Sequence, residues 1–342
     1  MKKTLLALLS GLFICGCGIC ATSELDILTL FSTKSNSPNK LWVGTFQLVF
    51  NDMKNNILKK DVIFVKERQT AELKGLNKEE FNKDMLNESS YYTSYGEVEP
   101  AAKEKIQKDI KEKFNETSDI IDTLDWTKRP DNYYAYAMLK KEFEFNNEFD
   151  KLEKASFNNS KEEYEFFGIR ENSDDILNKN LDVLFYNNMN DYAVKLLTKT
   201  GDEVYLYRTE SNSNFKKLYS QMQRKERRFK GKEFGENDTL KVPNLKIKDE
   251  KKYPQLCNKQ IKGTNFYFSE AIETIQFDLD NKGGKVKSEA ALIMKSLSLP
   301  HIDETQIRHF DFDKTFVLFL VDSNKKDPYL ALRIKDLKGL TK

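Results

Sequence analysis

The chain has 342 residues, a formal net charge of +2 and 39% hydrophobic residues, and it contains 24 phenylalanines and 15 tyrosines. This composition excludes an intrinsically disordered protein and predicts a soluble globular chain with one large domain or two smaller ones. Charged residues make up 32% of the chain with the two signs nearly balanced, which argues against a nucleic-acid partner.

Residues 1–21 have the pattern of an export signal. Two lysines precede an apolar run over residues 5–14, and small residues and cysteines follow. This run is too short to span a membrane as a mature helix. The run Ile14-Cys15-Gly16-Cys17 resembles a bacterial lipobox, in which Cys17 would be lipidated and would anchor an exported lipoprotein to a membrane. Cleavage after Ala21 is the alternative, and it would give a simply secreted, extracellular protein.

The cysteines and histidines are too few for a disulfide framework or a metal site. Three of the four cysteines lie in the export signal, so Cys257 is the only one deep in the mature chain. Cys257 is expected to be a buried small hydrophobe. His301 and His309 lie in no metal-ligand spacing and in no motif of a catalytic base. We therefore expect no metal, no cofactor and no enzymatic activity.

The N-terminal third predicts a tether followed by mainly helical structure. Residues 22–40 contain Ser-Asn-Ser-Pro-Asn and are expected to form the tether. Residues 67–100 are charged and show no clear period. Two amphipathic helices are predicted from apolar residues at helical spacing: one from Trp42, Phe46, Val49, Phe50 and Met53, and one over residues 101–114 from Ala102, Ile106, Ile110 and Phe114.

The remainder of the chain predicts strands. Residues 133–138 are rich in β-forming side chains, and residues 142–145 alternate between glutamate and phenylalanine. Residues 272–279 alternate with Ile275, Phe277 and Leu279 on one face, which is typical of a half-buried strand.

A long connection separates that strand from the last apolar one. Gly283 and Gly284 end the alternation, and the run from Phe316 to Val321 predicts a buried strand. Residues 285–309, roughly 25 in number, contain no further glycine and one proline, Pro300. A connection of this length in a compact domain is usually functional.

Two motifs in this region carry a family resemblance. Phe310-Asp311-Phe312-Asp313-Lys314-Thr315-Phe316, followed by the apolar strand, resembles the C-terminal signature of the serpins. Upstream, Gly284 and Ser288-Glu289-Ala290-Ala291 resemble the hinge of the serpin reactive-centre loop. The resemblance implies a divergent bacterial member, secreted or lipidated, with an α+β fold. It also implies a short strand over residues 61–64, a pair of strands over residues 181–197 and a further strand over residues 240–247. A single domain over residues 41–338 would hold three β-sheets, surrounding helices and an exposed reactive-centre loop.

The resemblance also implies a function. Serpins are suicide-substrate inhibitors, so the implied partner is a serine or cysteine protease, and the implied state is a monomer. Counting from the hinge motif places the reactive bond at His301-Ile302, whereas counting from Gly284 places it at Ser298-Leu299. After cleavage the loop inserts as a new strand into the central sheet. Val286, Ser288, Ala290 and Leu292 would share one face of that strand.

A second function is left open by the same residues. Leu292 and Ile293 are bulkier than the small residues that inhibitory serpins use in the hinge. The alternative is therefore a non-inhibitory surface lipoprotein that kept the fold and acts as a binding or structural module.

Overall fold

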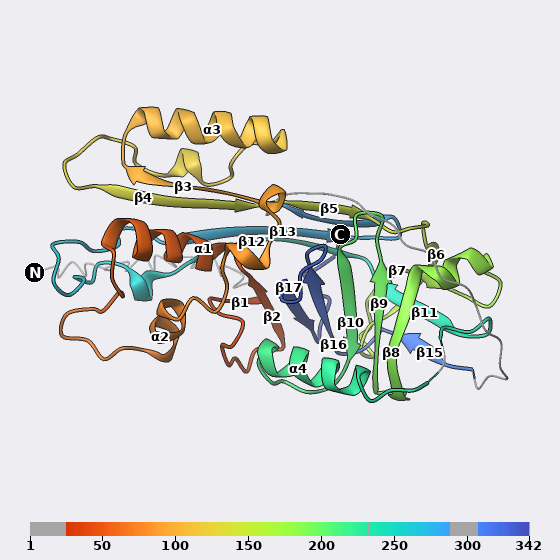
Figure 1. The fold of residues 1–342 in the computed structure, drawn as a ribbon. Helices are drawn as coiled ribbons and strands as arrows, with labels where there is room; N and C mark the ends of the chain where they lie inside the picture. The colour runs from red at the N-terminus through yellow and green to blue at the C-terminus, as the bar shows by residue number, and fades with distance from the viewer. Residues whose placement is uncertain (1–24, 232, 288–306, 342) are drawn as a thin grey trace, which may run out of the picture.

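In a computed structural model, which describes residues 25–231, 233–287 and 307–341, three β-sheets and a separate strand pair are surrounded by helices. The expected α+β architecture with several sheets is confirmed. Figure 1 shows the central sheet running along the molecule, with the other large sheet below it and the longest helix above it. In the described part of the chain, no helix is both long enough and apolar enough to cross a bilayer.

The largest sheet forms the base of the molecule. Its strand order is β1-β2-β17-β16-β10-β9-β8. All six residues of β16 are buried, because the strand is central and is covered on both faces. The packing of α4 (Phe215–Glu226) covers one face, with Phe215 and Tyr219 against Phe319. The strands are β1 (Leu25–Leu28), β2 (Asn39–Val43), β8 (Leu181–Asn188), β9 (Asp191–Leu197), β10 (Glu203–Arg208), β16 (Phe316–Val321) and β17 (Pro328–Ile334).

A four-stranded sheet lies at one end of the molecule in the order β15-β11-β7-β6. The strand after the long connection, β15, pairs in parallel with β11. This sheet therefore holds the distal end of the connection. Its strands are β6 (Asp150–Ser156), β7 (Glu163–Ile169), β11 (Thr239–Pro243) and β15 (His309–Asp311).

The central sheet has the order β12-β13-β14-β5. A strand pair, β3 with β4, continues it, because only Lys140 separates the end of β4 from the start of β5. The proximal end of the long connection, β14, lies inside this sheet. The strands are β3 (Tyr91–Glu97), β4 (Tyr133–Leu139), β5 (Lys141–Glu144), β12 (Leu245–Lys252), β13 (Ile272–Leu279) and β14 (Gly283–Lys287).

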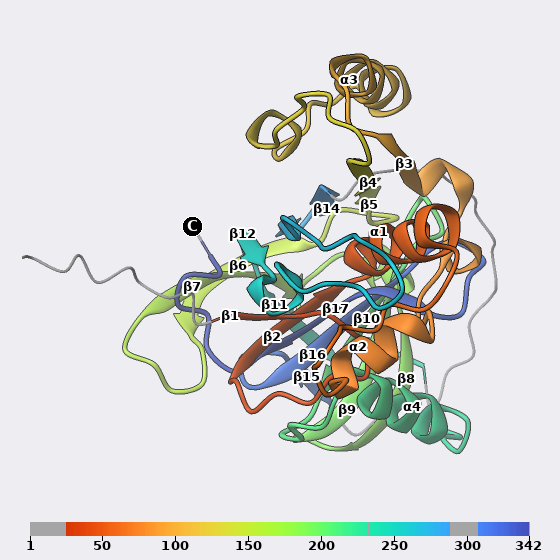
Figure 2. The same ribbon diagram turned by 90° about the vertical axis from the view of Figure 1, so that its left-hand side faces the viewer.

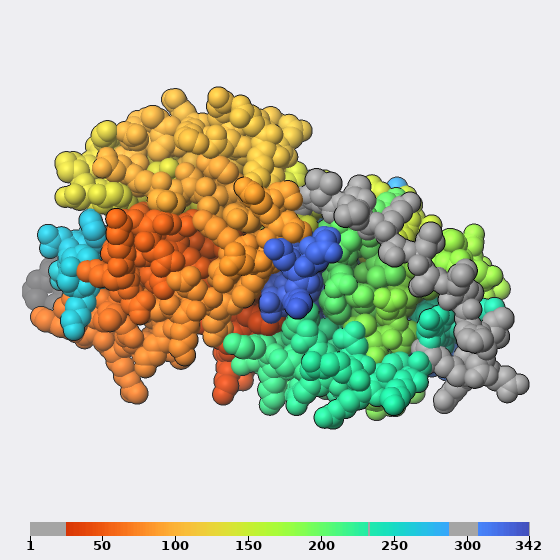
Figure 3. All heavy atoms as spheres, in the orientation of Figure 1, coloured from red at the N-terminus to blue at the C-terminus, as the bar shows by residue number. Residues whose placement is uncertain are grey.

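Helices cover both faces of the β4 end of this sheet. On the outer face, α3 (Pro100–Phe114) packs Ile106 and Ile110 near Tyr136 of β4, and it stands out from the rest of the molecule in Figures 2 and 3. On the inner face, α1 (Thr45–Asp52) packs against β4 and β13 and continues as a π-helix over Met53–Leu58. The remaining helices are α2 (Ala71–Asn77) and short 3₁₀ turns at Lys83–Met85, Glu88–Ser90, Ile121–Thr123, Asp175–Asn180 and Pro254–Leu256.

Several local expectations require correction. The expected tether is wrong for residues 25–40, because β1 pairs in parallel with β2 and buries Leu25. Trp42 belongs to β2 rather than to a helix. The helix begins only after Gly44, where a Cβ atom would lie 2.1 Å from the Phe81 ring.

Three smaller expectations also differ from the structure. The strand expected at residues 61–64 is reduced to one bridge between Phe64 and Ile261. Residues 67–100, which show no clear period, contain α2 and β3. Cys257 is half-buried rather than buried.

We predict that a chain beginning at residue 41 is less stable than one beginning at residue 25. The shorter chain loses the buried side chains of Leu25, Ile27 and Leu28. It also loses Asn39, whose amide donates to the Asp336 carbonyl and accepts from the Lys335 N–H. Each buried aliphatic side chain contributes about 1.5–3 kcal/mol, so urea unfolding should show a loss above about 4 kcal/mol. Equal stabilities would contradict the inclusion of residues 25–40 in the fold.

Candidate functional site: the hinge strand and the slot beneath it

The hinge strand β14 lies between β13 and β5 and forms backbone hydrogen bonds with both. A tight turn, closed by the Asp280 N–H donating to the Gly283 carbonyl at 2.9 Å, folds β14 back on β13. Val286 is opposite Phe277 of β13 on one side and Lys141 of β5 on the other. The two ladders satisfy the backbone groups of a segment that would otherwise be solvated.

Two glycines permit this close approach. A Cβ atom at Gly283 would lie 2.0 Å from the Phe143 carbonyl oxygen, and one at Gly284 would lie 2.4 Å from the Phe143 ring. Any larger side chain at Gly283 would push β14 away from the β5 backbone. The glycine pair therefore starts the strand inside the sheet.

The side chains of β14 alternate as expected. Val286 is fully buried, whereas Lys285 faces outward and pairs with Glu142 at 2.8 Å and with Glu116 at 3.7 Å. The pKa of Glu142 is lowered: burial opposes this, but the lysines Lys285 and Lys140 outweigh it. The predicted assignment of Val286 to the inward face is confirmed.

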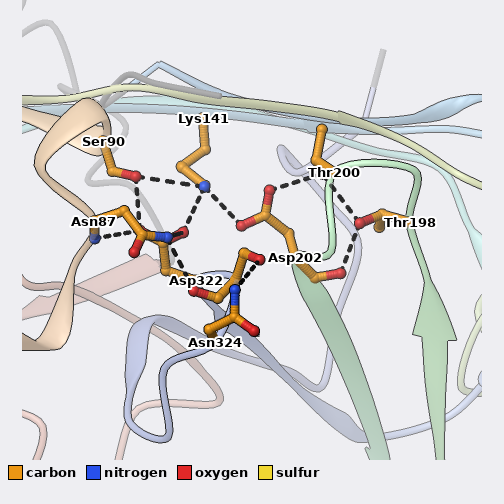
Figure 4. Close-up of polar contacts among 9 residues, drawn as sticks. Asn87, Ser90, Lys141, Thr198, Thr200, Asp202, Asp322 and Asn324 are labelled. Carbon is orange, nitrogen blue, oxygen red and sulfur yellow. Dashed lines mark hydrogen bonds and ion pairs between the residues drawn. The ribbon is translucent and has the colours of Figure 1, made fainter. Parts of the chain in front are cut away.

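A buried lysine lies in β5, the strand that pairs with β14, and Figure 4 shows its polar partners. Lys141 of β5 is 1% exposed, and its Nζ lies 2.7 Å from Asp202 Oδ1 and 2.8 Å from Asp322 Oδ1. Asp202 follows the β9–β10 turn, and Asp322 follows β16. The lysine thus joins the central sheet to two loops of the seven-stranded sheet.

The two carboxylates are held differently. Asp322 accepts hydrogen bonds from the Ser90 hydroxyl at 2.6 Å and from the Asn87 backbone N–H at 2.9 Å, and Asp202 accepts one from the Thr200 hydroxyl at 2.8 Å. Burial raises the pKa of Asp202 to about 6 despite the attraction of Lys141. Burial also acts on Asp322, but Lys141 and the extra donors lower its pKa.

A cavity continues the line of β14 toward the far end of the sheet. Its volume is about 270 Å³, and it is lined by residues of β4, of β13 and of α1 beneath them. Among the described residues, no backbone pairing joins β4 to β13. We call this cavity, with the two strands that flank it, the slot. A strand that prolonged β14 would enter the slot.

A second buried ionisable group lines the slot. Glu273 of β13 is 4% exposed, and its Oε2 accepts a hydrogen bond from the Tyr253 hydroxyl at 2.8 Å. Its Oε1 is buried without a hydrogen-bond partner. Burial raises the pKa of Glu273 to about 7, although the Tyr253 hydroxyl and the Phe46 backbone N–H lower it.

The distal end of the connection is anchored by a buried ion pair. The Arg308 guanidinium lies 2.6 Å from Asp238 Oδ2, and the Arg308 backbone N–H donates to Asp238 Oδ1 at 2.9 Å. Phe310 then packs against Tyr192 and Tyr186 at ring-centroid distances of 5.4 and 5.1 Å. Both ends of the connection are therefore fixed by interactions in different sheets.

The signature residues form the structure after this anchor. Phe310, Phe312 and Phe316 are fully buried, and Lys314 is exposed. Asp313 pairs with Lys241 at 3.2 Å, and the Thr315 carbonyl accepts from Arg208 Nη1 at 2.7 Å. In the described ranges, no group of three or more His, Cys, Asp or Glu side chains could hold a metal ion.

Comparison with solved structures identifies the fold. The thermophilic serpin Tengpin in its native state matches with a TM-score of 0.50 and 10% identity over 90% of this chain and 91% of its own. The chain has a serpin fold. Serpin48 of the insect Tenebrio molitor and human thyroxine-binding globulin with thyroxine match at TM-scores of 0.41, each with 12% identity. The first match covers 74% of this chain and 78% of its own, and the second covers 90% and 77%. No protein-family model and no curated protein matches the sequence.

Some of the expected site residues lie in the described part of the fold. Gly284 lies in β14, and the signature residues lie at and after β15. The hinge residues Ser288, Glu289, Ala290 and Ala291, both candidate reactive bonds (His301-Ile302 and Ser298-Leu299) and Cys17 lie outside the described residues. Serpins are generally protease inhibitors rather than enzymes.

Sequence reasoning missed the buried charges. Lys141 shares the inward face of its strand with Phe143 and Phe145, and Glu273 shares that of Ile275 and Phe277. The alternation that predicts these strands also places one charged residue on each apolar face. A charged residue at an inward position of an alternating strand was therefore the sequence signal for each buried charge.

We predict that Lys141→Met strongly destabilises the protein. The substitution leaves Asp202 and Asp322 buried without their cation, and breaking such a pair costs about 3–5 kcal/mol. The matched control is Lys199→Met, because Lys199 pairs with Glu144 at 2.8 Å in an exposed site. That control should cost less than about 1 kcal/mol. Urea unfolding at pH 7 measures both, and similar losses would contradict a structural role for the buried pair.

We predict that Glu273 makes the folded state less stable as the pH rises. Its pKa is about 7 in the folded protein and 4.5 ordinarily, so the folded state binds the proton more tightly. The free energy of unfolding should therefore fall between pH 4.5 and 7, by about 3 kcal/mol in all. Glu273→Gln removes this dependence. The difference in unfolding free energy between variant and parent, measured from pH 4.5 to 8, should grow in favour of the variant, and a constant difference would overturn the assignment.

Proposed function

We propose that this chain inhibits a serine or cysteine protease as a suicide substrate. The observation that carries the proposal is the position of β14: the proximal hinge lies between β13 and β5, in line with an unpaired slot between β13 and β4. An inserting strand needs such a slot, with a backbone edge on each side.

The chemical step takes place on the loop. The protease oxygen or sulfur attacks the carbonyl carbon of His301, and the His301–Ile302 bond breaks. Ile302 takes a proton from the protease and leaves as a new amino terminus, while His301 stays esterified to the enzyme. If the reactive bond is Ser298–Leu299, the same step occurs there. Water would complete the hydrolysis unless insertion first drags and distorts the protease while the acyl bond is still intact.

The register of β14 supports a register for the inserted strand. If both ladders were extended, Ser288 would lie opposite Ile275 and Leu139, and Ala290 opposite Glu273. The alternation set by buried Val286 would then turn Ser288, Ala290 and Leu292 inward, toward the cavity.

Insertion is favoured by strand pairing and by filling the cavity. Each added residue would bond to β13 and β4, whose facing edges are unpaired in the described structure. Because β14 is already paired with β13 and β5, insertion would extend an existing strand rather than start a new one. The folded, uncut protein thus stores the strain that strand addition releases.

A second candidate function is a non-inhibitory surface protein with the serpin fold. Glu273 favours it, because an inserted Ala290 would cover this carboxyl without offering it a hydrogen bond. Insertion slowed by this cost would let the protease complete hydrolysis. Such a protein would act as a binding or structural module.

We predict that Ala290→Arg turns the inhibitor into a substrate. In the cut, inserted state the arginine would be buried in the slot, at a cost of several kcal/mol. In the uncut state it should cost little. The variant should be cleaved at the same bond while the yield of gel-stable protease complex falls at least about tenfold.

The matched control is Glu289→Arg, which puts the same side chain on the opposite face of the inserted strand. Across a panel of serine and cysteine proteases, the control should keep most of the parent's complex yield. Complex formation that is equal for Ala290→Arg and the parent would show that the hinge register is wrong. A parent that forms no complex with any protease would favour the second function.

The export signal supports a membrane-anchored protein, and lipidation at Cys17 is the form that we propose. Acyl chains on Cys17 would hold the domain at a membrane surface. Cys17→Ser should abolish fatty-acid labelling and move the protein to the soluble fraction or leave it unprocessed. Unchanged labelling and membrane fractionation of this variant would rule out Cys17 as the attachment site.

A further inference from the structure

The slot has the lining of a small-molecule site as well as of a strand-insertion site. Its volume of about 270 Å³ is nearly twice that of an apolar cavity of about 150 Å³ known to bind benzene. Aromatic side chains from four parts of the chain contribute to the lining: Phe46, Phe50, Trp126, Tyr134, Tyr136 and Phe268. Ligand sites typically combine such apolar walls with a few polar groups.

The charged residues that line the slot are all acidic. Asp119, Asp125, Glu270 and Glu273 line it, and within the described ranges no lysine, arginine or histidine does. This is unusual for a chain with 56 lysines and arginines against 54 acidic residues. Asp125 is partly neutralised by Arg129 at 2.9 Å, outside the lining.

One of these carboxylates is set apart by its burial. Asp119, Asp125 and Glu270 are exposed, whereas Glu273 is 4% exposed and its Oε1 has no hydrogen-bond partner. Its other neighbours are the Tyr253 hydroxyl, which bonds Oε2, and the N-terminal turn of α1. A buried acceptor without a donor is costly, and a ligand that supplied a donor would remove that cost.

We propose that the slot binds a small aromatic ammonium compound, with its cationic group directed to Glu273 and its ring among the aromatic side chains. A primary ammonium supplies both the hydrogen-bond donor and the positive charge. Aromatic faces attract a cation, and this attraction is strongest where water is excluded. An anion of the same size would meet four carboxylates and is rejected.

The ligand and an inserted strand would compete for the same space. This consequence alone rests on the proposed inhibitory function, because it requires the loop to enter the slot. A bound ammonium compound would then delay insertion and let more of the protease escape. Binding itself requires only the intact, uncut chain.

Calorimetric titration of the intact chain tests the proposal with three molecules of similar shape. These are phenethylammonium, its neutral counterpart 2-phenylethanol, and the anion 3-phenylpropionate. Phenethylammonium should bind at least about tenfold more tightly than the alcohol, and the anion should not bind. Equal affinities for the ammonium compound and the alcohol, or no binding of either, would overturn the proposal.

Two variants locate the site. Glu273→Gln keeps the shape of the side chain and should reduce the preference for the ammonium compound to about threefold or less. Glu163→Gln, an exposed carboxyl on β7 away from the slot, should leave it unchanged. Ala137→Leu fills part of the cavity and should weaken the binding of the ammonium compound and of the alcohol alike. A preference for the ammonium compound that survives Glu273→Gln would refute the assignment, whatever the result of the protease assays.

Discussion

The ion pairs of Lys141 join the central sheet to the seven-stranded sheet. Lys141 comes from β5, whereas Asp202 and Asp322 come from loops at the edges of β10 and β16. β5 is also held by backbone contacts, since the Lys199 N–H donates to the Glu144 carbonyl at 2.8 Å and Phe145 forms a bridge with Thr198. Lys141 adds a buried ionic link to these contacts, so the sheet offers a fixed edge against which β14 can pair. The geometry of the hinge therefore depends in part on a buried charge in the neighbouring strand.

The hinge strand shows how a few residues control a sheet. Gly283 and Gly284 let β14 approach β5 more closely than any residue with a Cβ atom could. In this position of β14, Val286 is buried in the core, and Lys285 forms an ion pair with Glu142 on the outer surface. These contacts favour a strand that starts inside the sheet. The distal end is held in the same way by Arg308 and Asp238, so the intervening residues are bounded by two fixed points.

Periodicity predicted the elements well where one face is buried and the other is exposed to solvent. The strand at residues 272–279 follows from alternation and the helix ending at Phe114 from helical spacing. The strand at residues 316–321 follows instead from its continuous apolar run, and the one at residues 133–139 from its β-forming side chains. The start of α1 was mispredicted because β2 and α1 are both apolar, and Trp42 fits either pattern. The tether was mispredicted because Ser-Asn-Ser-Pro-Asn occurs in the connection between two paired strands as readily as in a linker. Local sequence does not distinguish the two, since the distinction depends on the β2 partner far along the chain.

The two buried charges give the hinge strand and the slot beyond it different electrostatic environments. Beside β14, Lys141 is surrounded by carboxylates and a hydroxyl, so it is a paired charge. In the slot, Glu273 Oε1 has no hydrogen-bond donor, so covering it with an apolar strand would have a cost that rises as the group ionises. If the loop inserts as proposed, strand pairing would favour insertion along the whole slot, whereas this carboxyl would oppose it at one point. Cleavage would free the other end of the loop, and the backbone pairing of every inserted residue could then offset the burial of Glu273.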